Sequence, residues 1–284
     1  MQKPKHKQIP VPPLLSQLPD APKLLFAIGN NLEELLAKPR VAIVGARKMS
    51  PYGQAVTEKL AAQLAGKGIV VVSGLAYGVD VCAHQAALAV GGQGIAVMAC
   101  GLDHIYPTAH TRIGEELVQK GGVILSEYPE RTTPMQYRFL ERNRLISALS
   151  DAVIITEAAQ RSGTLNTAAH ALNQGKPVLC VPGDITSELS AGTNNLLKAG
   201  ATPVTSVDDV LSLLGIDEEI QTALPLAANE NEFILLSLIK DGTSNGSDLL
   251  RQSELDAPTF NQTLTMLEIT RKIKPLGANH WTLA

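Results

Sequence analysis

Arginines and aromatic rings alternate in the segment Y-R-F-L-E-R-N-R, residues 137–144. Guanidinium groups of Arg138, Arg142 and Arg144 can bind phosphates, and a ring such as Phe139 can stack on a base. This combination suits a flexible single-stranded nucleic acid. A solvated helix start with Phe139 in the core explains the same residues without any ligand.

A second candidate site is the segment R-S-G-T-L-N-T-A-A-H at 161–170, which follows an expected strand and opens an expected helix near Gly163. Backbone amides at such a helix start bind anions, and the hydroxyls of Ser162 and Thr164 add donors. A plain Ser162 N-cap is the alternative. The neighbouring Arg161 favours phosphate binding.

The turn after the first expected strand, in V-A-I-V-G-A-R at 41–47, also carries a candidate. It lacks the G-x-G-x-x-G spacing of dinucleotide sites, but Gly45 permits close backbone approach and Arg47 can face a phosphate. Arg47 can equally be an ordinary charge at a helix edge.

Candidate catalytic sets are weak. Asp80 and His84 are four residues apart on an expected helix, yet no third metal ligand follows at a recognisable spacing. Glu127 and Glu157 can act as acid and base, but carboxylates at strand ends also cap helices or orient arginines. The sequence therefore predicts neither a metal nor a cofactor, and it does not require an enzyme.

These segments lie in a repeated pattern of short apolar runs, small-residue turns and helical stretches, which predicts βαβ units. The expected strands are 41–44, 69–72, 94–99, 123–125, 152–156 and 177–181. The expected helices are 52–66, 79–90, 110–120, 140–149, 163–174, 193–199 and 207–214. The fold class is α/β, an extended Rossmann-like, doubly wound and mostly parallel sheet with ligands at the carboxyl ends of its strands.

Four segments organise the chain. Residues 1–40 are expected to be an extended lead-in with a short helix, and 41–214 the Rossmann-like domain. An acidic linker over 215–230 leads to 231–284, where three helices and a hairpin predict a small C-terminal winged-helix domain.

Composition narrows the classes of protein. The chain has 284 residues, 45% of them hydrophobic and 18% charged, which excludes disorder and coiled coil. Without a long apolar stretch or a signal-peptide core, we expect a cytoplasmic protein with no membrane contact. The net charge of −3 means that nucleic-acid binding must be local, as at residues 131–144, where four arginines face one glutamate.

Six ordered motifs together resemble the DNA-processing protein A family (DprA, also Smf) over about residues 10–210. They are V-A-I-V-G-A-R, S-G-L-A-Y-G-V-D-V-C-A-H, G-L-D-H-I-Y-P, S-E-Y-P, R-N-R-L-I-S-A-L-S and S-G-T-L-N-T-A-A. The resemblance implies a homodimer that binds single-stranded DNA, protects incoming DNA and loads the RecA recombinase during natural transformation and recombination.

The resemblance also implies which residues contact DNA. They are Arg47, Arg142, Asn143, Arg144, Ser162, Gly163 and Thr164, and we add Gly74 and Phe139 to the expected DNA-binding residues. Arg47, Arg142 and Arg144 are expected to neutralise one phosphate each. The chain departs from the family pattern at Leu140, where the family has proline, and only a short lead-in precedes Val41, where the family has a helical domain.

Two other functions are open. A related Rossmann-like enzyme class hydrolyses nucleoside monophosphates at the ribose and carries a Pro-Gly-Gly motif, of which Pro182 and Gly183 supply only part. The second alternative is a regulator that reads double-stranded DNA with its winged helix, but residues 258–270, its third expected helix, contain no Lys or Arg. We expect the C-terminal domain to contact protein or support a dimer.

Overall fold

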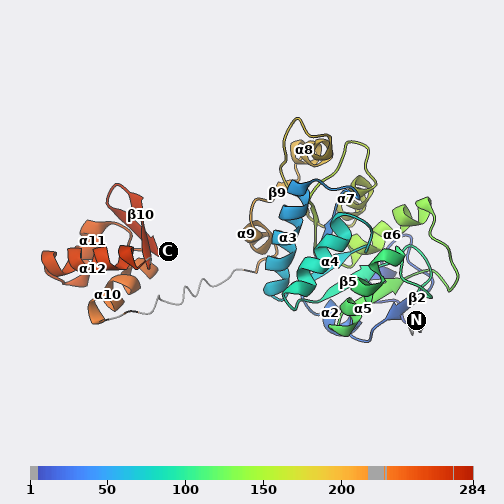
Figure 1. Cartoon of the computed structure of the whole chain (residues 1–284), viewed down its shortest axis with the longest axis horizontal. Helices are drawn as coiled ribbons and strands as arrows, with labels where there is room; N and C mark the ends of the chain where they lie inside the picture. The colour runs from blue at the N-terminus through green and yellow to red at the C-terminus, as the bar shows by residue number, and fades with distance from the viewer. Residues whose placement is uncertain (1–5, 217–226, 228, 271, 284) are drawn as a thin grey trace. The chain divides into compact units, whose positions relative to one another are not determined.

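The computed structural model describes residues 6–216, 227, 229–270 and 272–283, and its contacts divide the chain into the units Met1–Ile216 and Asp217–Ala284 (Figure 1). The larger unit is built on a sheet. In spatial order its strands are β1 (Lys7–Ile9), β2 (Leu25–Ile28), β6 (Val123–Ser126), β5 (Gly94–Val97), β4 (Val70–Ser73), β3 (Arg40–Val44), β7 (Ala152–Ile155), β8 (Val178–Cys180) and β9 (Thr202–Pro203). Neighbouring strands from β6 to β9 pair in parallel.

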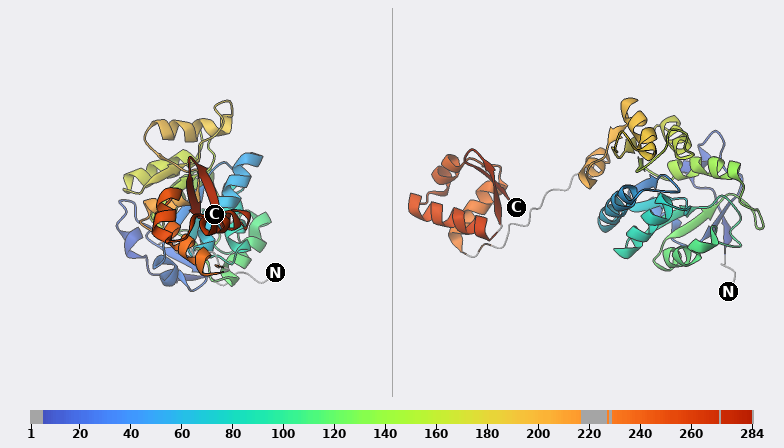
Figure 2. Two further views of the ribbon diagram at one scale, coloured as in Figure 1. Left: turned by 90° about the vertical axis from the view of Figure 1, so that its left-hand side faces the viewer. Right: turned by 45° about the horizontal axis from the view of Figure 1, so that its top comes forward.

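Helices cover both faces of this sheet, as the right-hand view of Figure 2 shows for α3 and α4 against α6 and α7. One face packs against α1 (Pro13–Ser16), α2 (Leu32–Leu36), α6 (Gln136–Ala148), α7 (Thr164–Asn173) and α8 (Ala191–Lys198). The other packs against α3 (Pro51–Gly66), α4 (Val79–Ala89), α5 (Thr111–Gln119) and α9 (Val207–Leu213). Successive residues of β3 alternate between the two cores, because side chains of a strand point to opposite faces.

The direction of winding reverses at β3. The chain proceeds from β3 through β4 and β5 to β6, and then crosses back to place β7 on the other side of β3. Right-handed crossovers put the helices of the two halves on opposite faces, so the loops after β3 and β7 diverge. The predicted doubly wound, mostly parallel sheet is confirmed, and its switch point lies between β3 and β7.

The N-terminal segment differs from the expected lead-in. Residues 1–40 contribute β1 and β2, which join the sheet in antiparallel fashion, with Phe26 opposite Ser126 of β6. These strands are only three and four residues long, too short for a periodic sequence signal. They cover the edge that β6 would otherwise expose, which explains why the segment belongs to the sheet.

The smaller unit contains helices α10 (Glu230–Lys240), α11 (Gly246–Ser253) and α12 (Ala257–Ile269), followed by the antiparallel pair β10 (Ile273–Gly277) and β11 (His280–Leu283). Leu235, Leu249, Phe260 and Leu267 form its core. The order of elements agrees with the predicted one, and the winged-helix assignment remains a prediction. Most of the expected linker over 215–230 lies outside the described residues. No described helix in either unit is long and apolar enough to cross a membrane.

Burial of His84 in α4 predicts a pH-dependent stability. The side chain is 1% exposed, and desolvation lowers its pKa to about 4, against about 6.5 in an unfolded chain. Between these values only the unfolded chain binds the proton, so the free energy of unfolding falls as the pH drops through this window. We expect a loss of about 2 kcal/mol from about pH 7 to about pH 5.

Urea titrations at several pH values measure this loss. The five tyrosines all lie in Met1–Ile216 and the single tryptophan lies in the other unit, so tyrosine signals isolate the larger unit. His84→Leu removes the titrating group and should flatten the dependence. If the free energy of unfolding of this variant depends on pH as it does in the parent, another group is responsible.

Candidate nucleic-acid interface

A crevice of about 400 Å³ opens at the carboxyl ends of β3 and β7, at the switch point of the sheet. Its walls come from the turn after β3, the first half of α6 and the start of α7. The cations among its described lining residues are Arg47, Lys48, Arg142 and Arg161, and the carboxylate is Asp80. Arg47, Lys48 and Arg161 are exposed, so their charges face solvent in the crevice.

Arg47 stacks on Phe139. Its guanidinium carbon lies 4.6 Å from the centroid of the Phe139 ring, and the Tyr106 ring lies 6.1 Å from the same ring at a tilt of 52°. The two contacts hold Arg47 at the crevice and cover part of Phe139. A base that stacked on Phe139, as expected from the sequence, would have to compete with the protein's own Arg47.

Arg142 forms the floor of the crevice. It is only 3% exposed, and its Nη1 donates to the carbonyl oxygens of Val97 and, at 2.9 Å, Gly74. Burial lowers the pKa of its guanidinium, which the charge of Asp80 opposes. Asp80 in turn accepts a 3.2 Å bond from the amide of Gly74, and desolvation raises the pKa of this carboxyl. Arg142 therefore lines the crevice with one nitrogen already committed to the protein.

Gly74 makes room for Arg142. A Cβ at this position would lie 2.2 Å from Nη1 of Arg142, so a larger residue would displace the guanidinium. Gly74 is itself buried and lies outside the lining of the crevice. The structure thus gives this glycine a packing role beneath the expected site.

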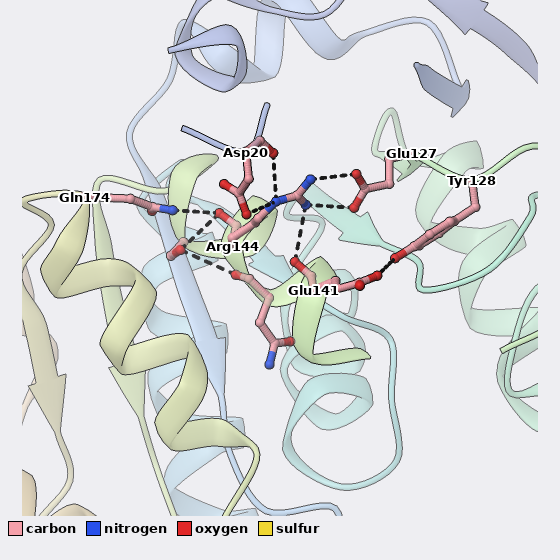
Figure 3. A network of polar contacts seen from close by, with 8 residues as sticks. Asp20, Glu127, Tyr128, Glu141, Arg144 and Gln174 are labelled. Carbon is pink, nitrogen blue, oxygen red and sulfur yellow. Dashed lines mark hydrogen bonds and ion pairs between the residues drawn. The ribbon is translucent and has the colours of Figure 1, made fainter. Parts of the chain in front are cut away.

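Arg144 lies away from the crevice, in the polar network of Figure 3. Its Nη1 donates to Oε1 of Glu127 and its Nη2 donates to Oε2, both at 2.7 Å. Its Nε lies 2.8 Å from a carboxylate oxygen of Asp20. Desolvation opposes its charge, but the hydrogen bonds and charge of Glu127 outweigh this and raise its pKa. Glu127, one of the candidate acids, is occupied by this pair.

The helical geometry of α6 explains why the expected arginine patch is split. Residues two apart on an α-helix point in nearly opposite directions, so Arg142 and Arg144 cannot share a face. Asn143 points between them toward α7, where its Nδ2 lies 3.4 Å from the carbonyl oxygen of Gly163. Of the R-N-R element, Arg142 and Asn143 reach the crevice lining and Arg144 does not.

The start of α7 lacks the Ser162 N-cap that the sequence offered as an alternative, because Gly163 is the N-cap residue and no side chain caps the helix. The hydroxyl oxygen of Ser162 accepts from the amide of Thr164 at 3.2 Å, and the Thr164 hydroxyl donates to the carbonyl oxygen of Gly45 at 3.0 Å. Thr164 thus ties the turn after β3 to α7, while the Ser162 hydroxyl still has its own proton to donate. A Cβ on Gly163 would meet only Leu140, at 3.5 Å.

The other candidate acid, Glu157, has structural partners. Glu157 is 2% exposed and accepts from the Ser50 hydroxyl and, at 2.8 Å, from the Ser50 amide at the start of α3. It therefore helps to cap that helix. No group of three or more His, Cys, Asp or Glu side chains in the described part of the chain could hold a metal ion.

Sequence reasoning did not select Lys48, Tyr77 and Tyr106, and it named Arg161 only as a neighbour that favours phosphate binding. Lys48 and Arg161 line the crevice, and the rings of Tyr77 and Tyr106 are exposed. A signal was available, because these residues follow strands β3, β7, β4 and β5, and the carboxyl ends of parallel strands meet at one edge of the sheet.

A doubly wound sheet with a cationic crevice at its switch point defines a Rossmann-like α/β protein. Within this class, the family model for DNA recombination-mediator protein A matches residues 4–215. The chain belongs to that family. The matched range covers the sheet and the crevice and ends before the smaller unit.

Curated relatives share the same region. A putative DNA processing protein DprA of Mycobacterium tuberculosis is 43% identical over 69% of this chain and 50% of its own length. Protein Smf of Escherichia coli is 41% identical over 75% of this chain and 58% of its own length. The chain thus spans between half and three fifths of these two relatives.

Solved structures of two relatives have the same fold. DNA processing protein A of Helicobacter pylori, described by its single-stranded DNA binding mode, has a TM-score of 0.69 and 38% identity over 76% of this chain and 99% of its own. DprA of Streptococcus pneumoniae has a TM-score of 0.67 and 41% identity over 73% of this chain and 74% of its own.

Arg144→Ala should destabilise the larger unit. It leaves the largely buried carboxylate of Glu127 without its bidentate partner, which costs about 3 kcal/mol or more. Urea unfolding followed by tyrosine signals measures the loss, and Arg144→Met combined with Glu127→Leu should recover much of it. If Arg144 contacted phosphate instead, Arg144→Ala would keep its stability and lose DNA affinity.

Proposed function

We propose that this protein binds single-stranded DNA in the crevice between β3 and β7. The observation that carries the proposal is the placement of Arg47, Lys48 and Arg161, three exposed cations around one concave site in a chain of net negative charge. Such a site attracts a phosphate backbone locally, without a basic field over the whole protein. The single-stranded DNA binding described for the Helicobacter pylori relative supports the same assignment.

The sequence-expected site residues keep different parts in this proposal. Arg47, Ser162, Gly163, Arg142 and Asn143 all line the crevice. In the proposal Arg47, Ser162 and Gly163 contact phosphate, whereas Arg142 and Asn143 shape and charge the wall. Phe139, Gly74 and Thr164 position their neighbours. Arg144 acts through the ion pair with Glu127 rather than on DNA.

The family supports a biological role. We propose that the protein protects incoming DNA and loads RecA recombinase onto it during natural transformation and recombination, as a cytoplasmic homodimer without a membrane partner. This is a binding function that needs no cofactor. The family name, a recombination mediator, supports the class of role.

An enzyme of the nucleoside monophosphate phosphoribohydrolase type is not favoured. Its acid in this fold would be Glu157, whose carboxylate is buried against the start of α3 and bonded to Ser50. Incubation with nucleoside monophosphates should release no free base; turnover that Glu157→Gln abolishes would overturn the binding-protein assignment.

Arg47→Ala tests the proposed function directly. If Arg47 neutralises one phosphate, its removal should reduce the slope of log affinity against log salt by about 0.7 for single strands. Affinity should fall in proportion for pyrimidine and mixed sequences, because phosphate contacts carry no base information. Fluorescence anisotropy with labelled oligonucleotides at several salt concentrations measures both quantities.

Lys59→Ala is the matched control for Arg47→Ala, since Lys59 is an exposed cation of α3 outside the crevice. It should leave the slope unchanged. Equal effects of the two variants would mean that the binding is a diffuse charge effect and that the crevice is not the site.

Gly163→Ala separates binding from folding. The added Cβ meets only Leu140 at ordinary van der Waals distance, so stability should stay within about 0.5 kcal/mol of the parent. A phosphate at the start of α7 would be pushed away from the backbone amides, and affinity should fall about tenfold. Thermal unfolding and anisotropy together check the two parts; unchanged affinity would remove α7 from the site.

A further inference from the structure

Three tyrosines follow three adjacent strands at the edge of the sheet that holds the crevice. Tyr77 follows β4, Tyr106 follows β5 and Tyr128 follows β6, and these strands neighbour one another in the order β6, β5, β4 beside β3. Because neighbouring strands lie about 5 Å apart, the loops that carry the three tyrosines follow one another along this edge in the order of their strands. Since β4 neighbours β3, the strand that Arg47 follows, this row of loops leads away from the switch point.

Tyr77 and Tyr106 present rings to solvent in this row. They are 50% and 36% exposed. The Tyr77 ring meets the His110 ring edge to face at 4.8 Å, and Tyr106 leans on Phe139. His110 is itself anchored, with Nδ1 2.8 Å from the carbonyl oxygen of Leu75. Each exposed ring is therefore held at one side, which limits the entropy lost when a base stacks on it.

Tyr128 differs from the other two. Its hydroxyl donates to Glu141 at 2.9 Å, and the guanidinium of Arg138 covers its ring at 5.4 Å from the centroid. Tyr106, in contrast, contacts Phe139, the ring on which Arg47 stacks. A base on Tyr106 would thus lie close to a cation that can hold its phosphate.

The distribution of charge favours a DNA strand that leaves the crevice over β4 and β5 rather than beyond β7. On the other side of the crevice, beyond β7, a second cavity of about 440 Å³ is lined by Glu157 and Asp184, and no lysine or arginine occurs among its described lining residues. Carboxylates without cations repel a phosphate backbone. A DNA strand that leaves the crevice meets negative charge like its own on that side, and aromatic rings on the side of β4 and β5.

We propose that single-stranded DNA leaves the crevice over β4 and β5, and that its bases stack on Tyr77 and Tyr106. This inference rests on the proposed function and adds the path of the strand to it. Base stacking is indifferent to sequence, because every base has a flat face. The path therefore extends the site without adding sequence preference.

The test compares two oligonucleotides of equal length, oligothymidylate and a strand of abasic residues, for binding to the full chain. Tyr77→Ala and Tyr106→Ala should each weaken binding of oligothymidylate about tenfold, with the salt slope preserved. Neither should affect the abasic strand, which has the same phosphates and no bases. Tyr106→Phe keeps an aromatic ring and should bind as the parent does.

Tyr52→Ala is the matched control, because Tyr52 is 49% exposed and lines the acidic cavity on the other side. It should leave affinity unchanged. If Tyr52→Ala weakens binding of oligothymidylate and Tyr77→Ala does not, the strand takes the opposite path. If Tyr77→Ala and Tyr106→Ala weaken binding of the abasic strand equally, the rings act through the fold. Either result overturns this inference alone. The proposed function fails separately if the parent chain binds neither oligonucleotide.

Discussion

The pairing of β3 with both β4 and β7 is the constraint on which the rest of the larger unit depends. Parallel pairing on both sides of one strand requires the chain to wind outward in one direction and then in the other. Right-handed crossovers then place the two groups of helices on opposite faces, so the loops after β3 and β7 cannot cover each other. The crevice is the consequence, and its lining comes from segments more than a hundred residues apart.

Two buried arginines of α6 are accommodated in different ways. Arg144 meets the carboxylates of Glu127 and Asp20, which join the N-terminal segment, the loop after β6 and α6 into one network. Arg142 is held by backbone carbonyl oxygens and the charge of Asp80, in a space that exists because residue 74 is glycine. A buried charge is tolerated only with such partners. The pair therefore stabilises the frame around the crevice, while the exposed cations remain available to a ligand.

The division between frame and ligand contact also organises the aromatic residues. Phe139 supports Arg47 and is partly covered by it, and Tyr128 is covered by Arg138. Tyr77 and Tyr106 are supported at one side and exposed elsewhere. The side chains with the most freedom to meet a flexible strand are thus those at the ends of short stacks, and they lie on the side of the crevice away from Glu157 and Asp184.

Local patterns in the sequence determined the parallel strands, the helices between them, the family and the edge of the sheet proposed to bind DNA, because apolar runs and turn residues act over a few positions. The sequence did not predict the two short N-terminal strands, since three or four residues carry no period and their place in the sheet depends on pairing with β6. Only the tertiary structure decided the parts played by Arg142 and Arg144. Both belong to one R-N-R motif, but the helical turn separates their directions, and distant Asp80 and Glu127 determine what each guanidinium can do.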